Sequence, residues 1–151
     1  MSSAAAKALP HLRSAYKHFL PIATRWMDND VYGHVGNVVY YSYFDTVVNE
    51  YLISHDVLDI ANSAVIGLVV ETGCSYFAPI AFPEKIVAGL RVAKIGNSSV
   101  RYEVALFRDA GEGDDRAVAQ GHFVHVYVDR ASAKPQPLGG ALMAALVKIQ
   151  I

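Results

Sequence analysis

The chain has 151 residues, the usual length of one domain and enough to bury a single hydrophobic core. Thirteen basic and fourteen acidic side chains leave a formal charge of −1, so the overall charge does not attract nucleic acid or an anionic membrane. Hydrophobic residues make up 53% of the sequence, and the mean hydropathy is +0.25. Apolar runs such as residues 64–70 are far shorter than the ~20 residues that cross a bilayer. We therefore expect no membrane span, no nucleic-acid partner, and surplus apolar surface in a subunit interface.

The N-terminal end and the cysteine content bear on compartment and domain organisation. Residues 1–12 are predicted to form a flexible tail, and residues 13–151 a single domain. The Ala-rich start is interrupted by Lys7 and Pro10 before it could form the core of a signal peptide. Cys74 is the one cysteine, which excludes an intrachain disulfide and suits a reducing cytoplasm. We expect a cytoplasmic location.

One long helix dominates the first half of the chain. Residues 14–26 have an extended pattern, residues 27–36 form a polar loop, and residues 38–55 are predicted to be helical. Asn37 is the expected N-cap, because its side-chain oxygen can accept an early unpaired amide. Six apolar residues fall on one face at helical spacing: Tyr40, Phe44, Val47, Val48, Tyr51 and Leu52.

Four strands are predicted after the helix, over residues 64–76, 85–95, 100–108 and 118–129. Residues 85–95 and 100–108 alternate between apolar and polar side chains, as half-buried strands do. Polar turns are expected at residues 96–98 and 111–115, and a short C-terminal helix from about residue 138. The order predicts an α+β fold, with successive hairpins forming an antiparallel sheet of about five strands. One helix covers such a sheet only in part, which again favours a second subunit.

The loop before the helix holds the densest cluster of reactive side chains. Asp30 and His34 stand close to the expected helix start, where unpaired amides carry a partial positive charge. A carboxylate beside such amides suits attack on a carbonyl, because the amides stabilise the oxyanion that develops. Asp28 is interpreted as a residue that shapes the loop by accepting backbone amides.

Other chemistries are less well supported. The Asp-x-Asp-x-x-Gly spacing resembles the start of a calcium loop, but Val39 stands where a bidentate glutamate is needed. His122 and His125 are three apart on a predicted strand, so they point to opposite faces and form a poor metal pair. Cys74 lies in an apolar strand and is expected to be a core residue.

The loop also resembles that of the hot-dog thioesterase superfamily, in the branch of 4-hydroxybenzoyl-CoA and related acyl-CoA thioesterases. Residues 28–35 match the Asp-x-Asp-x-x-Gly-x-Val pattern of that branch. Many members continue with Asn-Asn, whereas this chain has Gly36 and Asn37. Residues 76–83, 96–100, 119–121 and 126–129 match later motifs in order, so the resemblance covers most of the chain.

The resemblance implies a hot-dog fold, in which an antiparallel sheet of about five strands wraps around one long central helix. Two subunits pair into a double hot-dog, with a possible further assembly of two dimers into a tetramer. The implied reaction is hydrolysis of an acyl-CoA thioester to the free acid and coenzyme A. No metal or organic cofactor is implied, since coenzyme A is part of the substrate.

The resemblance also assigns roles to residues, with Asp30 as the catalytic carboxylate and the helix-start amide, that of Asn37 or its neighbour, as the group that polarises the thioester carbonyl. Asp30 either attacks the carbonyl to form an anhydride or deprotonates a water. His34 either orients substrate or water or makes a structural hydrogen bond. Expected substrate contacts are Tyr32, Gly33, Val35 and Tyr40 near the loop, and Ser98, Ser99, Arg91 and Arg101 toward the coenzyme A phosphates across a dimer.

Two alternative functions remain on the same fold. One is an acyl-CoA hydratase or dehydratase, which usually pairs an aspartate and a histidine five residues apart; Asp30 and His34 are four apart. The other is a non-catalytic acyl-CoA-binding module, against which the retained Asp30 counts.

Overall fold

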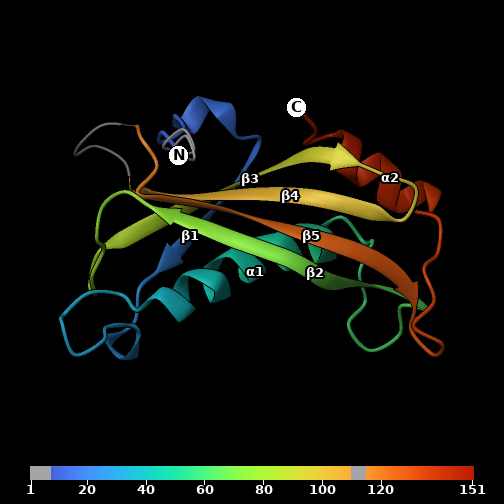
Figure 1. The fold of residues 1–151 in the computed structure, drawn as a ribbon, viewed down its shortest axis with the longest axis horizontal. Coiled ribbons are helices and arrows are strands. Elements are labelled where there is room, and N and C mark those ends of the chain that lie inside the picture. Colours follow the sequence, from blue (N-terminus) through green and yellow to red (C-terminus); the bar gives the residue numbers. More distant parts are fainter. Residues whose placement is uncertain (1–7, 110–114) are drawn as a thin grey trace, which may run out of the picture.

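The computed structural model describes residues 8–109 and 115–151, which form one antiparallel sheet with a long helix packed across it (Figure 1). The long helix α1 covers Asn37–Ser54, and the short helix α2 covers Gly140–Val147. The strands are β1 (His18–Ala23), β2 (Val65–Tyr76), β3 (Lys85–Ile95), β4 (Ser99–Arg108) and β5 (Ala119–Asp129). This confirms the predicted α+β architecture of five antiparallel strands and one long helix.

The strand order is β1-β3-β4-β5-β2, which corrects one part of the predicted connectivity. β3, β4 and β5 are successive antiparallel neighbours, and Gly96 donates to the Ser99 carbonyl in the predicted β3–β4 turn. β2 was expected to form a hairpin with β3, but it pairs with β5 at the opposite edge. The pairing of β2 was predicted wrongly because the alternation of apolar and polar residues in a strand indicates which face is buried, but not which strand lies beside it.

The segment of residues 77–84 joins β2 to β3 by crossing the end of the sheet. The amides of Phe77 and Ala78 donate to the Val118 carbonyl, and Arg108 donates to the Pro79 carbonyl. Ile80 is 1% exposed and packs into the core. The crossing therefore places residues 77–82 against the loop that precedes α1.

The hydrophobic core lies between α1 and the concave face of the sheet. All six residues of the predicted apolar helix face are buried, together with Tyr43. They pack on alternate residues of β3 and β4, including Leu90, Val92, Tyr102 and Val104, which are 0% exposed. Burial of these side chains stabilises α1, because the helix is rich in β-branched and tyrosine residues whose intrinsic helix propensity is weak.

Several predicted boundaries change in the structure. The N-cap of α1 is Gly36, not Asn37, which is the first helical residue; its Oδ1 still accepts the Val38 amide at 3.0 Å. The extended region expected over residues 14–26 contains β1 between two short 3₁₀ turns, Arg13–Ala15 and Trp26–Asp28.

The structure bears only in part on the predicted N-terminal tail and on the predicted turn at residues 111–115. Residues 1–7 of the predicted tail lie outside the described residues, whereas Leu9 and His11 are hydrogen-bonded to Gln120 on β5. Most of the turn predicted at residues 111–115 lies outside the described residues as well. Across the described ranges, no helix is both long and apolar enough to cross a membrane.

Candidate active site

The loop of residues 29–36 is a tight hairpin-like turn that ends at the start of α1. The Asp30 amide donates to the His34 carbonyl at 2.8 Å, and the Gly33 amide donates to the Asp30 carbonyl at 3.1 Å. Gly33 has φ +81°, a left-handed conformation that glycine adopts without steric cost. Asp30 Oδ1 accepts the Tyr32 amide at 2.8 Å, which fixes the carboxylate against its own turn.

This turn brings Asp30 beside the first residues of α1. A Cβ placed on Gly36, the N-cap, would lie 3.9 Å from the Asp30 Cβ. Among the described residues the Asn37 amide has no hydrogen-bond partner, so it is free to bind an incoming oxygen. Asp30 itself is exposed in the single chain. A carboxylate and an unpaired helix-start amide thus stand on the same short stretch of backbone.

Asp28 anchors the base of the loop from below. It is 2% exposed, and its carboxylate accepts the Arg25 backbone amide at 2.8 Å and the Tyr43 hydroxyl at 2.5 Å. The Arg25 guanidinium completes the set with an ion pair at 2.9 Å. Burial raises the pKa of Asp28, but the hydrogen bonds from Tyr43 and Arg25 outweigh burial and hold this pKa below its ordinary value. The predicted loop-shaping role of Asp28 is therefore confirmed.

The crossing segment of residues 77–84 holds the other side of the loop. The Val35 amide donates to the Ile80 carbonyl at 2.8 Å, and the Phe82 amide donates to Asn29 Oδ1 at 2.9 Å. Because Ile80 is fixed in the core, the loop is connected to a rigid part of the molecule. Such support is what a positioned catalytic group requires.

A pocket of about 380 Å³ opens next to this loop. Its lining combines His34, Val35, Asn37 and Tyr40 with residues 76–79 of β2 and the crossing segment. The rings of Tyr40 and Tyr76 pack edge to face, with centroids 4.9 Å apart. The structure thus brings together His34, Val35, Asn37 and Tyr40, while Tyr32 is 83% exposed and is not part of the pocket wall.

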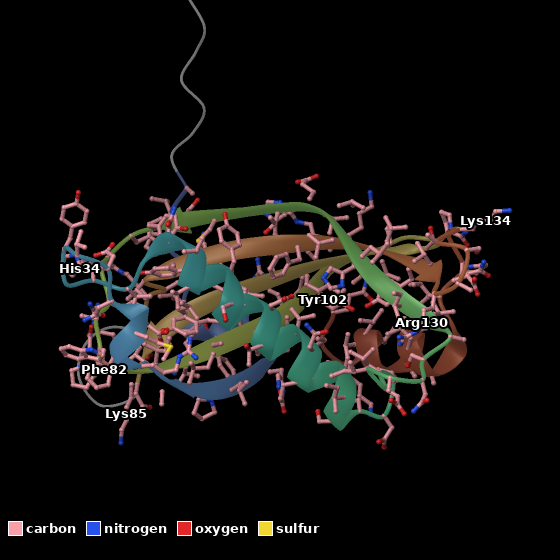
Figure 2. All side chains as sticks on the ribbon, turned by 90° about the horizontal axis from the view of Figure 1, so that it is seen from below. His34, Phe82, Lys85, Tyr102, Arg130 and Lys134 are labelled. Carbon is pink, nitrogen blue, oxygen red and sulfur yellow. The ribbon has the colours of Figure 1, made fainter. Side chains whose placement is uncertain are left out.

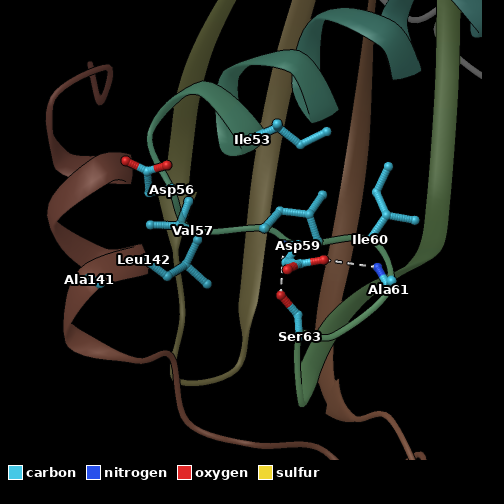
Figure 3. Close-up of a pocket in the computed structure, with 10 residues that line it drawn as sticks. Ile53, Asp56, Val57, Asp59, Ile60, Ala61, Ser63, Ala141 and Leu142 are labelled. Atoms are coloured by element: carbon cyan, nitrogen blue, oxygen red, sulfur yellow. Dashed lines mark hydrogen bonds between the residues drawn. The ribbon is translucent and has the colours of Figure 1, made fainter.

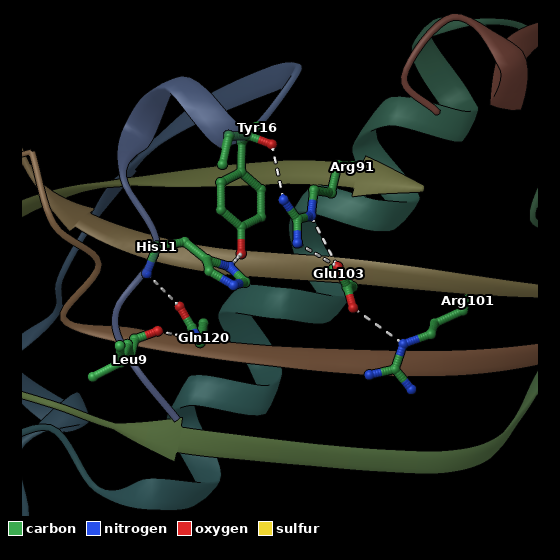
Figure 4. A network of polar contacts seen from close by, with 8 residues as sticks. Leu9, His11, Tyr16, Arg91, Arg101, Glu103 and Gln120 are labelled. Atoms are coloured by element: carbon green, nitrogen blue, oxygen red, sulfur yellow. Dashed lines mark hydrogen bonds and ion pairs between the residues drawn. The ribbon is translucent and has the colours of Figure 1, made fainter. Parts of the chain in front are cut away.

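The residues expected to bind the coenzyme A phosphates lie elsewhere in the single chain. Arg91 and Arg101 both pair with Glu103 on the outer face of the sheet, at 2.7 and 3.1 Å, in a network that includes His11 and Tyr16 (Figure 4). Ser98 and Ser99 lie at the β3–β4 turn, where the Ser98 carbonyl accepts the Tyr127 amide.

The β3–β4 turn belongs to the end of the sheet remote from the loop. Figure 2 shows His34 and Phe82 at one end of α1 and Arg130 and Lys134 at the other. Lys85 begins β3 near the loop, and the eleven residues of β3 carry the chain to the far end. A contact between Ser98 or Ser99 and a substrate held at Asp30 therefore requires a second subunit.

Two histidines of β5 and the cysteine of β2 take the structural positions that the sequence predicts. His122 and His125 lie on opposite faces of β5, as predicted: His122 contacts Glu71 at 2.9 Å, and His125 is buried. Burial raises the pKa of the Cys74 thiol to about 11, consistent with a core residue that does not act as a thiolate. Within residues 8–109 and 115–151, no three His, Cys, Asp or Glu side chains are grouped to hold a metal ion.

Sequence analysis missed three parts of the site. Tyr43 lies outside the apolar face counted at helical spacing, and its contact with Asp28 depends on how the loop folds back. The sequence gives no signal for a role of Asn29, although its side chain accepts the Phe82 amide. The crossing segment was recognised as a motif, but its contact with the loop follows from the unexpected position of β2.

The contact between Tyr43 and Asp28 leads to a stability prediction. Tyr43→Phe removes a hydrogen bond to a buried carboxylate, and we expect the free energy of unfolding to fall by about 2 kcal/mol. Urea denaturation measures this loss. Tyr51→Phe is the matched control, because the Tyr51 hydroxyl donates to the neutral Ala145 carbonyl. The control should lose about 1 kcal/mol; equal losses in the two variants would contradict a charged anchor at Asp28.

Comparison with known proteins gives the class to which this fold and site belong. The family model of the thioesterase-like superfamily matches residues 24–146. The structure is similar to that of the PA5185 protein from Pseudomonas aeruginosa strain PAO1, with 56% sequence identity, a TM-score of 0.89, and coverage of 94% of this chain and 97% of that one. No curated protein sequence matches the chain.

Two further solved structures carry descriptions of activity. The PA2801 protein of Pseudomonas aeruginosa, described as a proposed thioesterase, is 27% identical, with a TM-score of 0.78 over 86% of this chain and 98% of that one. A 1,4-dihydroxy-2-naphthoyl-CoA thioesterase from Synechocystis is 15% identical, with a TM-score of 0.76 over 85% and 94%, which shows a shared fold. The chain belongs to the thioesterase-like superfamily, with the hot-dog architecture that its sequence predicts. Thioester hydrolysis is the activity that this membership supports.

Proposed function

We propose that this protein is a homodimeric acyl-CoA thioesterase that uses Asp30 as its catalytic carboxylate. The observation that carries the proposal is the position of Asp30 beside Gly36 and the unpaired Asn37 amide, next to a pocket lined by His34 and Tyr40. Asp30 is not part of the pocket wall, so a thioester carbonyl held at the mouth of the pocket would have the carboxylate on one side and the helix-start amide at its oxygen. That arrangement supplies both groups that acyl transfer needs.

Two balanced routes lead to the same products. In one, the Asp30 carboxylate attacks the carbonyl carbon, the C–S bond breaks, and coenzyme A leaves as a thiolate; water then hydrolyses the mixed anhydride and restores Asp30. In the other, Asp30 removes a proton from a water whose oxygen forms the new C–O bond, and that proton passes to the leaving thiolate. In both routes the Asn37 amide stabilises the oxyanion of the tetrahedral intermediate.

A second subunit completes the proposed site. Asp30 is exposed in one chain, and a solvated carboxylate is a weak base and nucleophile, so a partner that excludes water would activate it. Around the loop, Trp26, Val31 and Tyr32 are all at least 80% exposed, which is unusual for large apolar side chains. A dimer interface over this surface explains both features.

The free edge of β2 is the second part of the proposed interface. β1, at the other edge, has six residues including Pro21, whereas β2 has twelve residues and exposes Leu68, Val69 and Val70. Long apolar edge strands pair readily with another copy, and short edges with proline do not. We expect β2 of one subunit to pair with β2 of its partner.

This interface makes a direct prediction. Val70 is 61% exposed, and Val70→Lys should convert a dimer into a monomer in light scattering, because each subunit would bring a charged side chain into the paired edges. Thiol release should fall with the dimer. Val147→Lys, on the exposed surface of α2, is the matched control and should stay dimeric and active. A Val70→Lys variant that remains a dimer would exclude this edge as the interface.

A thiol-release assay over a panel of acyl-CoAs, from acetyl to palmitoyl and benzoyl, tests the function itself. We expect free coenzyme A and free acid in equal amounts for at least one member of the panel. Loss of an enoyl-CoA without thiol release would identify a hydratase, and binding without turnover would identify an acyl-CoA-binding module. Cleavage of acyl-carrier-protein thioesters alone would keep the reaction and change the substrate.

A further inference from the structure

A second, partly enclosed pocket lies at the C-terminal end of α1, away from the loop of residues 29–36. It has a volume of about 240 Å³, and its wall includes Leu52 of α1, Ile66 of β2, His125 of β5 and Leu142 of α2. Asn49, also in the wall, is twelve residues from Asn37, or about 18 Å along the helix axis. Phe44, Val47 and Val48 are 0% exposed and fill the core between these positions. In one subunit this pocket is therefore separate from the pocket at Asp30.

His125 is the unusual member of the wall. Its side chain is buried, with the whole residue 4% exposed, and in the described part of the chain neither ring nitrogen has a hydrogen-bond partner. A buried polar group without a partner is costly and calls for an explanation. Its aromatic neighbours do not supply one, because the Tyr102 and Tyr127 hydroxyls bond to each other at 2.6 Å.

The position of the His125 ring depends on a glycine. A Cβ on Gly67 would lie only 2.8 Å from His125 Nδ1 and 3.2 Å from the Tyr127 ring. Glycine at this point of β2 therefore allows the imidazole to lie against the strand and to form part of the pocket wall. On its other side the ring packs against Tyr102, with centroids 4.9 Å apart.

The pocket adjoins a groove on the surface. An open groove of about 790 Å³, formed by the loop after α1 and by α2, shares Val57, Leu58 and Leu142 with the partly enclosed pocket (Figure 3). These three side chains contribute to the walls of both spaces. Movement of the loop of residues 57–63 would connect them.

The charges around the groove and the pocket select a neutral ligand. Among residues 8–109 and 115–151, no Lys, Arg, Asp or Glu contributes to the wall of this pocket, so an ionised group inside it would have no counter-charge. Asp56 and Asp59 line the groove, and the nearby Arg130 guanidinium already donates to the Ser63 and Ile60 carbonyls. The free carboxylate that a thioesterase releases is thus a poor occupant.

We infer that this pocket binds a neutral, mainly apolar molecule with one hydroxyl group, which hydrogen-bonds to His125 when the imidazole, whose two nitrogens are covered by their neighbours in the single chain, turns toward the pocket. An apolar cavity of about 150 Å³ holds benzene, so 240 Å³ has room for roughly ten non-hydrogen atoms, such as an alkylphenol. A neutral imidazole offers one acceptor and one donor, and a hydroxyl can satisfy either. The inference does not depend on the reaction at Asp30.

Binding of three matched probes to the intact protein tests this inference by calorimetry. 4-Ethylphenol should bind about tenfold more tightly than ethylbenzene, which lacks the hydroxyl, and 4-ethylbenzoate should not bind. In ¹⁵N-histidine-labelled protein, 4-ethylphenol should shift the ring nitrogens of the buried histidine. Equal affinity for the phenol and ethylbenzene, or preference for the benzoate, would overturn the inference. The absence of any binding at millimolar concentrations would also overturn it and leave ordered water as the partner of His125.

A ring-preserving variant checks the residue assignment. His125→Phe keeps an aromatic side chain and removes both nitrogens, so the preference for 4-ethylphenol over ethylbenzene should vanish while ethylbenzene still binds. A variant that retains the tenfold preference would show that another group recognises the hydroxyl. The comparison of probes on the unaltered protein stands even if this variant does not fold.

Discussion

Asp30→Asn should lower the turnover of acyl-CoA hydrolysis by at least about a hundredfold, while the affinity for the substrate changes little. Asparagine retains the size of aspartate and can still accept the Tyr32 amide that now binds Asp30 Oδ1. It cannot attack a carbonyl as a carboxylate does, and it is not a base. The expected loss is therefore one of chemistry and not of loop structure.

The measurement is thiol release at saturating substrate, together with a thermal melt to show that the variant is folded. Asp56→Asn is the matched control, because Asp56 lies beyond the end of α1 and its positive φ is one that asparagine also tolerates. The control should turn over like the unaltered protein. An Asp30→Asn variant with full activity would remove Asp30 from the mechanism and leave His34 as the reactive side chain at this pocket.

Local features of this fold could be predicted from the sequence because they depend on neighbouring residues. The apolar face of α1 follows from helical spacing, and β3 begins and ends as its alternation predicts. The position of β2 at the edge could not be predicted, since it depends on Ile80 and its neighbours crossing the end of the sheet.

The candidate site divides in the same way. Asp30, His34 and Asn37 are close in sequence, so their proximity at the start of α1 follows from the loop and the helix alone. Two other contacts join segments that are distant in sequence, and only the folded chain shows them: the hydrogen bond of Tyr43 to Asp28 and that of Phe82 to Asn29. Arg91 is an expected contact of the coenzyme A phosphates in the sequence analysis, whereas the register of β3 and β4 places it opposite Glu103, with which it forms an ion pair.

His125 should make the protein strongly sensitive to acid. Burial lowers the pKa of His125 from 6.5 to about 4 in the folded state, and the neighbouring Tyr102 and Tyr127 hydroxyls stay protonated because burial raises their pKa values. Between pH 6.5 and pH 4 the unfolded chain binds a proton at this position and the folded chain does not, so stability falls as the pH falls. At about 1.4 kcal/mol for each pKa unit, the loss attributable to His125 approaches about 3 kcal/mol at pH 4.

Urea denaturation of the protein and of His125→Phe at pH 7, 5.5 and 4 isolates this loss. Other groups, including Asp28 with its lowered pKa, also lose stabilising interactions in acid, but they contribute equally to both proteins and cancel in the difference. We expect the variant to lose about 3 kcal/mol less than the parent between pH 7 and pH 4. Parallel pH profiles for the parent and His125→Phe would mean that the His125 imidazole is hydrated or charged in the folded protein. The pocket beside His125 would then lack the neutral ring that recognition of a hydroxyl requires.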